Sequence, residues 1–216
     1  MMRGKIKVAI ITNIIPTYRK GFYDRLFLNN SLETTVYCQS HICGMNIIPI
    51  HKNYDGNVRI VKFISAKNEK ISWQFLPWIE IIKKYDVVYV SGNPRCLSDL
   101  FFSVFLKIIG KRVVLWTMAC SYRGKKTTEY IRLQWARIFP MLFLYTDKEA
   151  DYLRKKGFKN HFMLGMNNGL DQNKIDQVIQ QWTSERLSKW MENNGYKERI
   201  MLLSSARLDP KNRFDV

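Results

Sequence analysis

Short runs of apolar residues alternate along the chain with longer segments in which apolar positions recur every three or four residues. The short runs, rich in Val, Ile, Leu and Phe, predict buried strands at residues 6–12, 35–38, 58–64, 86–90, 112–117, 141–145, 161–164 and 200–203. The longer segments predict helices at residues 21–29, 72–85, 96–109, 127–139, 148–156 and 172–194. This alternation predicts an α/β fold, a Rossmann-like parallel sheet with helices on both faces.

The order of these elements divides the chain into three parts. Residues 1–170 contain the alternating strands and helices of an N-terminal Rossmann-like domain, and residues 171–199 are expected to form an interdomain linker helix. The apolar run at residues 200–203 precedes a polar turn at residues 209–212, where a helix is expected to begin. We therefore expect residues 200–216 to be the start of a second α/β domain that is truncated after its first strand and loop.

Polar side chains follow several of the predicted strands. Ligands of parallel sheets bind beyond the carboxyl ends of the strands, a rule that selects the loops at residues 13–20, 91–95, 118–126 and 167–171. Tyr18 offers an aromatic face and a hydroxyl for a sugar, and Arg19 offers a planar fork for a phosphate or carboxylate. The alternative is an ordinary strand-to-helix turn with Arg19 in solvent. The candidate binding residues are Asn13, Thr17, Tyr18, Arg19, Asn93, Tyr122 and Arg123.

The charge balance narrows the class of partner. The chain has 35 Lys and Arg against 18 Asp and Glu, a formal net charge of +17. Such an excess favours nucleic acid, acidic lipid headgroups or phosphorylated substrates, unless it is only a solvated basic surface. No nucleic-acid-binding motif occurs, so nucleic acid is not favoured.

Residues 95–137 combine basic and aromatic side chains. They include nine basic residues and two acidic ones. The interleaved aromatic residues are Phe101, Phe102, Phe105, Trp116, Tyr130 and Trp135. This mixture suits an anionic membrane surface. Packing of the same aromatic side chains against the sheet is an equally good interpretation.

Cysteine usage and the lack of targeting signals predict a cytoplasmic protein. The four cysteines (Cys38, Cys43, Cys96 and Cys120) show neither a C-x-x-C pair nor zinc-ligand spacing, so we expect free thiols and no metal. The N-terminus lacks a signal-peptide core, and the apolar segment at residues 97–109 is shorter than the about 20 residues that span a bilayer. Peripheral association with the inner face of the cell membrane stays an open alternative.

Three motifs occur in order along the chain. Residues 11–23 read ITNIIPTYRKGFY, residues 167–171 read NNGLD, and residues 206–215 read ARLDPKNRFD. They resemble, in turn, a T-N-x-P-x-P-Y-R-x-x-F-Y opening, a P-N-G-V-D hinge and a G-R-L-x-P-x-K-N-x-D donor-domain start. All three are typical of retaining glycosyltransferases of family 4. The resemblance implies the GT-B fold, in which residues 1–170 are the acceptor-side domain.

The resemblance also implies an activity. A hexosyl-type transferase of this family moves a sugar from a nucleotide sugar to a saccharide or lipid-linked saccharide, in polysaccharide biosynthesis, without a metal or other cofactor. It makes the seven candidate residues above acceptor-binding, and it places Asn168 and Gly169 at the interdomain hinge. Arg207 and Lys211 would hold the donor phosphates, although Lys211 lies one residue earlier than the family lysine. Met118 stands where the family has a histidine near the acceptor, so no catalytic residue is assigned.

Two other interpretations stay open at this point. The chain could be a non-catalytic partner subunit, with its donor domain supplied by another chain. It could also be a basic module that binds membrane or nucleic acid. As an acceptor-side part alone, it is expected to bind acceptor or membrane and to show little transferase activity.

Overall fold

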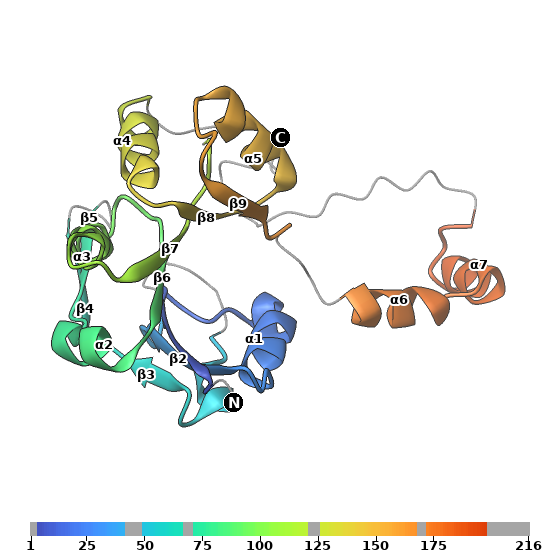
Figure 1. The fold of residues 1–216 in the computed structure, drawn as a ribbon. Helices are drawn as coiled ribbons and strands as arrows, with labels where there is room; N and C mark the ends of the chain where they lie inside the picture. Colours follow the sequence, from blue (N-terminus) through green and yellow to red (C-terminus); the bar gives the residue numbers. More distant parts are fainter. Residues whose placement is uncertain (1–3, 42–48, 67–70, 121–125, 168–171, 198–216) are drawn as a thin grey trace. The chain divides into compact units, whose positions relative to one another are not determined.

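A computed structural model describes residues 4–41, 49–66, 71–120, 126–167 and 172–197 (Figure 1). The chain divides into two compact units, residues 1–171 and residues 172–216. The candidate residues Tyr122, Arg123, Asn168, Gly169, Arg207 and Lys211 lie outside the described residues. The predicted strand at residues 200–203 lies outside them as well.

A parallel sheet forms the centre of the first unit. Seven strands of the described residues pair in the order β3-β2-β1-β6-β7-β8-β9, and every pairing is parallel. Their bounds are β1 Ile6–Ile11, β2 Leu32–Cys38, β3 Val58–Ile60, β6 Val87–Ser91, β7 Arg112–Trp116, β8 Met141–Leu144 and β9 Phe162–Gly165. The predicted α/β fold with a Rossmann-like parallel sheet is confirmed.

Helices cover both faces of this sheet (Figure 1). They are α1 Lys20–Phe27, α2 Trp78–Lys84, α3 Leu97–Ile108, α4 Lys126–Arg137 and α5 Asp147–Lys155, with short 3₁₀ turns η1 Thr17–Arg19 and η2 His51–Tyr54. Side chains of α2 to α5 pack in one core, and those of α1 pack in a second core. Strand β1 contributes side chains to both cores, because successive side chains of a strand point to opposite faces of the sheet. Ala9 and Ile11 lie in the first core, and Ile10 lies in the second.

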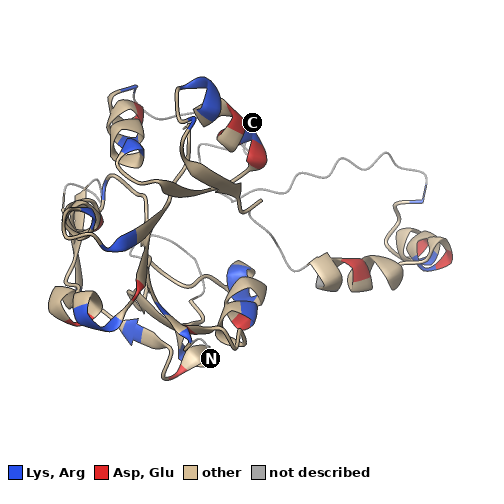
Figure 2. Ribbon diagram, in the orientation of Figure 1, with Lys and Arg blue, Asp and Glu red and all other residues tan. Residues whose placement is uncertain are grey.

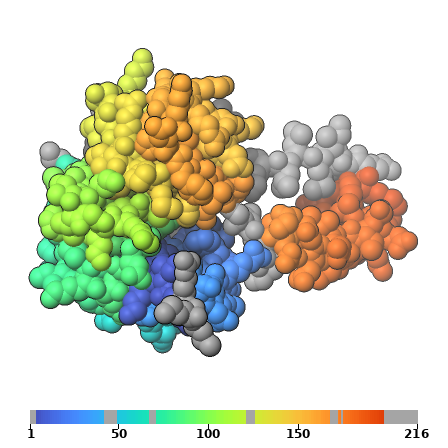
Figure 3. All heavy atoms as spheres, in the orientation of Figure 1, coloured from blue at the N-terminus to red at the C-terminus, as the bar shows by residue number. Residues whose placement is uncertain are grey.

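The two cores are closely packed. Figure 3 shows the side chains of the first unit forming a continuous outer surface on the face turned to the viewer. Phe102, Leu106, Leu115, Phe139 and Leu142 are fully buried in the first core. This burial explains why the short apolar runs of the sequence mark the strands so clearly.

The helices of the first unit end on basic residues. The last turns of α1 to α5 contain Arg25, Lys83, Lys84, Lys107, Arg137, Arg154 and Lys155, and Figure 2 shows these basic segments spread around the sheet. Positive side chains offset the negative end of the helix dipole. Because each helix runs back against its strands, these ends adjoin the amino ends of the strands. Part of the +17 charge therefore stabilises helix ends and lies away from the carboxyl ends of the strands.

The predicted helix at residues 72–85 is wrong in its first half. Residues Ile71–Gln74 form strand β5, which pairs antiparallel with β4, Phe63–Ala66. Helix α2 starts only at Trp78, directly after Pro77. Proline has no N–H and is tolerated at a helix start, and it disfavours helical geometry in the residue before it. The predicted strand at residues 58–64 is accordingly two strands, β3 and β4.

Residues 172–197, the described part of the second unit, form two helices where the sequence predicted one. They are α6, Gln172–Gln180, and α7, Ser184–Asn193. The side chain of Thr183 accepts a hydrogen bond from the Arg186 N–H and caps α7. An N-cap of this kind starts a new helix, so the continuous helix predicted over residues 172–194 is wrong. The Trp182 and Trp190 rings meet edge to face across the turn, 6.2 Å apart.

Candidate functional site

The order of the sheet reverses between β1 and β6. From β1 the chain adds β2 and β3 on one side, and from β6 it adds β7, β8 and β9 on the other. The connections after β1 and β6 therefore leave the sheet toward opposite faces. In open parallel sheets ligands bind beyond the carboxyl ends of the strands at such a switch point. The candidate site consists of the residues that follow β1, β6, β7 and β8.

The loop after β1 is held in place by backbone hydrogen bonds. The Gln39 N–H donates to the Asn13 carbonyl at 3.0 Å, and the Ile50 N–H donates to the Ile15 carbonyl at 3.0 Å. Ile15 is fully buried in the second core. These contacts fix the start of the loop against the neighbouring strand and turn, so its next residues have a defined direction.

A single 3₁₀ turn then presents three candidate residues together. Thr17, Tyr18 and Arg19 form η1, which is closed by a hydrogen bond of 3.0 Å from the Arg19 N–H to the Pro16 carbonyl. Tyr18 is half exposed, and Arg19 is only partly accessible. The structure therefore brings together Asn13, Thr17, Tyr18 and Arg19 in one loop at the switch point.

Arg19 lies against an aromatic cluster rather than in open solvent. Its guanidinium carbon is 3.7 Å from the ring centroid of Trp116, the last residue of β7. Tyr145, directly after β8, stacks on the Trp116 ring, and the two ring centroids are 5.3 Å apart. A cation over an aromatic face gains about 0.5–2 kcal/mol, depending on how far it is desolvated. Arg19 therefore packs on an aromatic ring and is only partly accessible to solvent, and the segments after β1, β7 and β8 meet at this cluster.

The loop after β6 is tied closely to the end of β7. The Gly92 N–H donates to the Trp116 carbonyl at 2.6 Å, and a side chain at Gly92 would place its Cβ only 2.7 Å from the Thr117 Cβ. Only glycine fits this approach. Asn93, the candidate of this loop, uses its Oδ1 to accept the Arg95 N–H at 3.1 Å, so this oxygen shapes the turn.

Glu149 joins the loops after β7 and β8, and the sequence analysis did not single it out. Its Oε1 accepts the Ala119 N–H at 3.1 Å and its Oε2 accepts the Tyr145 N–H at 2.8 Å. Thr146 caps α5 by accepting the Glu149 N–H at 3.3 Å. The T-x-x-E spacing of these two residues is a helix-start signature that could have marked Glu149 from the sequence.

A buried polar network lies beneath the first loop. Gln74 donates through Nε2 to the Thr12 carbonyl at 3.1 Å, and its N–H donates to the Ser98 hydroxyl at 2.9 Å. Ser98 in turn donates to Asp99 Oδ1 at 3.3 Å. Asp99 is completely buried in the first turn of α3. This burial raises the pKa of the Asp99 carboxyl to about 7, because transfer from water disfavours the charged form.

Buried polar atoms without a protein partner gather at this edge of the sheet. Among the described residues, eight buried side-chain atoms have no hydrogen-bond partner. Five of them belong to residues at or beside the carboxyl ends of the strands, namely Asn13, Gln74, Asp99, Trp116 and Arg132. Buried polar groups in proteins are nearly always paired. This edge is therefore where most of the unpaired buried polar atoms of the described residues lie.

The hinge-like motif at residues 167–171 starts two residues after β9, and Asn167 is its only described residue. Asn167 has a positive φ of 49° and donates through Nδ2 to Asp147 Oδ2 at 3.0 Å. Asparagine tolerates this left-handed conformation better than most residues. Asn167 therefore has a turn conformation, as the composition of the motif predicts.

The described part of the chain has neither a metal-binding cluster nor a membrane-spanning helix. No group of three or more His, Cys, Asp and Glu side chains there is arranged to hold a metal ion. No described helix combines the length and apolar character that crossing a bilayer requires.

Comparison with known proteins gives no relative to reason from. No family model matches the chain, and no curated protein matches it either. The fold and the residues of the candidate site are therefore the evidence for function.

Proposed function

We propose that this chain contains the acceptor-side domain of a retaining, hexosyl-type glycosyltransferase that uses a nucleotide sugar. The observation that carries the proposal is the cluster of Tyr18, Arg19, Trp116 and Tyr145 at the switch point of a Rossmann-like sheet. Aromatic faces and hydroxyls suit a saccharide, and a guanidinium suits a phosphate or carboxylate on it. The resemblance of residues 11–23, 167–171 and 206–215 to family 4 motifs supports the same function.

In this proposal the described residues bind and orient the acceptor. Tyr18 and Tyr145 bring ring faces and hydroxyls to the sugar, and Arg19 brings a charge whose position is set by Trp116. Holding a reactant in one orientation lowers the barrier without any covalent step. Arg207 and Lys211 would hold the donor diphosphate and stabilise its negative charge as the sugar leaves. Asn168 and Gly169 would form the hinge, and no metal or other cofactor is proposed.

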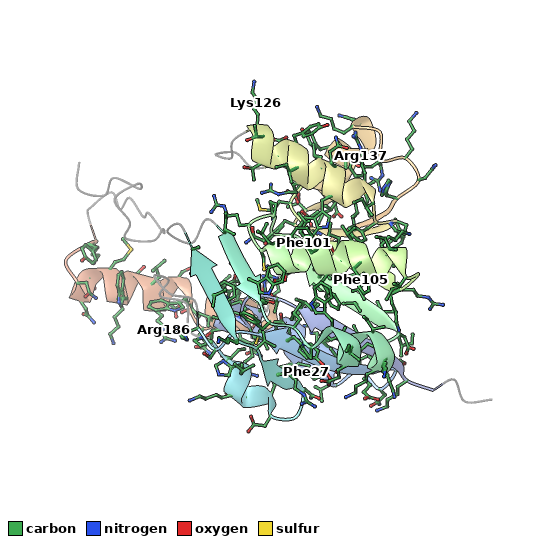
Figure 4. The ribbon with its side chains drawn as sticks, turned by 90° about the vertical axis from the view of Figure 1, so that its left-hand side faces the viewer. Phe27, Phe101, Phe105, Lys126, Arg137 and Arg186 are labelled. Carbon is green, nitrogen blue, oxygen red and sulfur yellow. The ribbon has the colours of Figure 1, made fainter. Side chains whose placement is uncertain are left out.

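We further propose that the domain docks on the inner, anionic face of the cell membrane, where a lipid-linked acceptor is found. Helix α3 has a second apolar side: Phe101, Phe105 and Ile108 are 54%, 39% and 76% exposed, at helical spacing. Figure 4 shows Phe101 and Phe105 on one side of the molecule, below α4 with Lys126 and Arg137 at its two ends. Exposed apolar side chains among basic ones suit an acidic lipid surface.

A transfer assay tests the proposed function. The full-length protein is mixed with radiolabelled nucleotide hexoses and membrane lipid extract, and label in the organic phase is counted. We expect incorporation from at least one nucleotide sugar. Arg19→Met should lower it at least tenfold, because it keeps the packing against Trp116 and removes the charge. The control Arg59→Met, on the exposed far edge at β3, should not. No incorporation from any donor, or equal incorporation by Arg19→Met, would contradict the proposal.

A further inference from the structure

The β4–β5 hairpin carries its polar side chains on its inner face. Directly opposite residues of an antiparallel pair point to the same face, and successive residues of a strand alternate between faces. Ser65, Ser72 and Gln74 therefore share one face of the hairpin. Gln74 is fully buried, donates through Nε2 to the Thr12 carbonyl at 3.1 Å and donates through its N–H to the Ser98 hydroxyl at 2.9 Å. This face is thus turned toward the body of the first unit.

The opposite face of the hairpin is apolar and lies outward. It carries Ile64, Ala66, Ile71 and Trp73, as the same register requires. The first three side chains are exposed and the last is half-buried. A sheet with one solvated face normally turns its apolar side chains to the core and its polar ones to water. The hairpin has the reverse arrangement, which indicates that its outward face contacts something other than water.

Trp73 joins this outward face to α3. The centroids of the Trp73 and Phe101 rings are 6.3 Å apart, and Figure 4 shows the hairpin beside the end of α3 that bears Phe101. Phe101, Phe105 and Ile108 then continue along the exposed side of the helix at helical spacing. The hairpin and α3 therefore share one apolar surface, and a contiguous exposed surface of this kind marks a site of protein or membrane contact.

Basic side chains border the apolar surface and favour a membrane. Lys62 Nζ lies 5.5 Å from the centroid of the exposed Phe75 ring. Arg95 is exposed beside β5, where its carbonyl accepts the Ser72 N–H at 2.9 Å. Lys107 is exposed in the last turn of α3. Lysine and arginine attract anionic lipid headgroups, and tryptophan is enriched at the boundary between lipid and water.

We propose that the outward face of the β4–β5 hairpin enters the interface of an anionic membrane together with the exposed side of α3. The hairpin is then a second docking element, and the choice of a membrane as its partner rests on the proposed function. Its inner face ties it to the candidate site, because Gln74 holds the Thr12 carbonyl directly before the acceptor loop. The hairpin thereby connects the lipid surface to the loop that binds the acceptor.

Binding of the full-length protein to vesicles tests the hairpin separately from α3. The vesicles contain phosphatidylcholine with or without phosphatidylglycerol, and they contain neither acceptor nor nucleotide sugar. Co-sedimentation should show binding only with phosphatidylglycerol. Ile64→Asp should weaken it about tenfold or more, because a carboxylate replaces an apolar side chain at the lipid surface. Ile60→Asp on β3 makes the same change at the same exposed fraction, 50%, and should leave binding unchanged.

A tryptophan at the same two positions gives a second readout. Ile64→Trp keeps the outward face apolar, so it tests the location of the hairpin without weakening the contact. Fluorescence is measured with vesicles of brominated phosphatidylglycerol, which quench tryptophan only at close range. The fluorescence that Ile64→Trp adds to the wild-type signal should be quenched, and the fluorescence that Ile60→Trp adds should not.

The outcomes separate the hairpin from the rest of the proposed function. Equal vesicle binding by Ile64→Asp and the wild type, or an unquenched Ile64→Trp, overturns the role of the hairpin and leaves α3 as the docking element. Self-association that Ile64→Asp abolishes while vesicle binding is unchanged would make this face a contact between two copies, which also overturns it. Vesicle binding that depends on Ile64 supports the hairpin even if no sugar transfer is ever found.

Discussion

At the scale of single residues, Asp99 is the most constrained group of the candidate site. It is completely buried at the start of α3, and no cation pairs with it among the described residues. The Ser98 hydroxyl donates to its Oδ1 at 3.3 Å, and its Oδ2 has no described partner. A buried carboxyl in this position is more stable as the neutral acid, which couples the stability of the domain to pH.

Replacing Asp99 by asparagine should remove that coupling. The folded-state pKa of about 7 lies above the ordinary value of 3.8. The contribution of Asp99 to stability is therefore fully present below about pH 4 and is lost as pH rises through 7. Asp99→Asn should make the free energy of unfolding less dependent on pH in this window, by up to about 1.4 kcal/mol per pH unit. Urea unfolding at pH 4, 5, 6, 7 and 8, followed by tryptophan fluorescence, measures it.

A matched variant controls for the loss of a carboxylate. Asp55→Asn makes the same chemical change at an exposed position after η2. It should leave the pH dependence as in the wild type. Parallel curves for Asp99→Asn and the wild type would show that Asp99 does not couple stability to pH.

At the scale of elements, the sequence predicted the parallel strands and most of the helices well, because buried apolar runs and glycine ends are local signals. Gly110, Gly157 and Gly195 all have positive φ at helix ends, as their positions indicate. The β4–β5 hairpin was missed, since the apolar spacing of residues 72–85 fits a helix while Pro77 and long-range pairing decide otherwise. Among the site residues, the sequence indicated the first loop. It could not indicate Glu149, whose role depends on contacts between separate elements.

Glu149→Gln should loosen the link between two of these elements. The substitution turns one carboxylate oxygen into an NH₂ donor, which leaves the N–H of Ala119 or Tyr145 facing another donor. An unsatisfied buried N–H costs about 1–3 kcal/mol. We expect a loss of stability of that size, and faster hydrogen exchange at both amides by NMR. The same change at exposed Glu33 on β2 should affect neither. Unchanged exchange at Ala119 and Tyr145 would refute the link.

At the scale of the whole molecule, the excess of positive charge is spread over several elements. Basic last turns on α1 to α5 account for part of it by offsetting helix dipoles. Arg19 and Arg95 lie instead in the segments that follow the carboxyl ends of β1 and β6. The outer side of α3 is apolar, in contrast to this charged surface. The molecule thus combines basic helix ends, arginines beside the strand ends and an apolar side of α3. The apolar side of α3 leads to a prediction about membrane binding.

Replacing Phe101 and Phe105 together by serine should weaken binding to vesicles. Exposed phenylalanine side chains gain about 1.5–3 kcal/mol each when fully buried, so the loss should be tenfold or more. Co-sedimentation with phosphatidylglycerol-containing vesicles measures it, and binding should fall as salt rises. Phe162→Ser, a similarly exposed position on β9, serves as the control. Equal binding by the double variant and the wild type would remove α3 from the docking surface.

The central place of β1 has a consequence for how the protein is made. Strand β1 pairs with β2 on one side and with β6 on the other. The first partner leaves the ribosome soon after β1, but the second is Val87–Ser91, far along the chain. A nascent chain that ends before residue 91 must therefore carry an unpaired strand edge, which is prone to wrong association. During synthesis of the first unit, one edge of β1 therefore stays unpaired until β6 has been made.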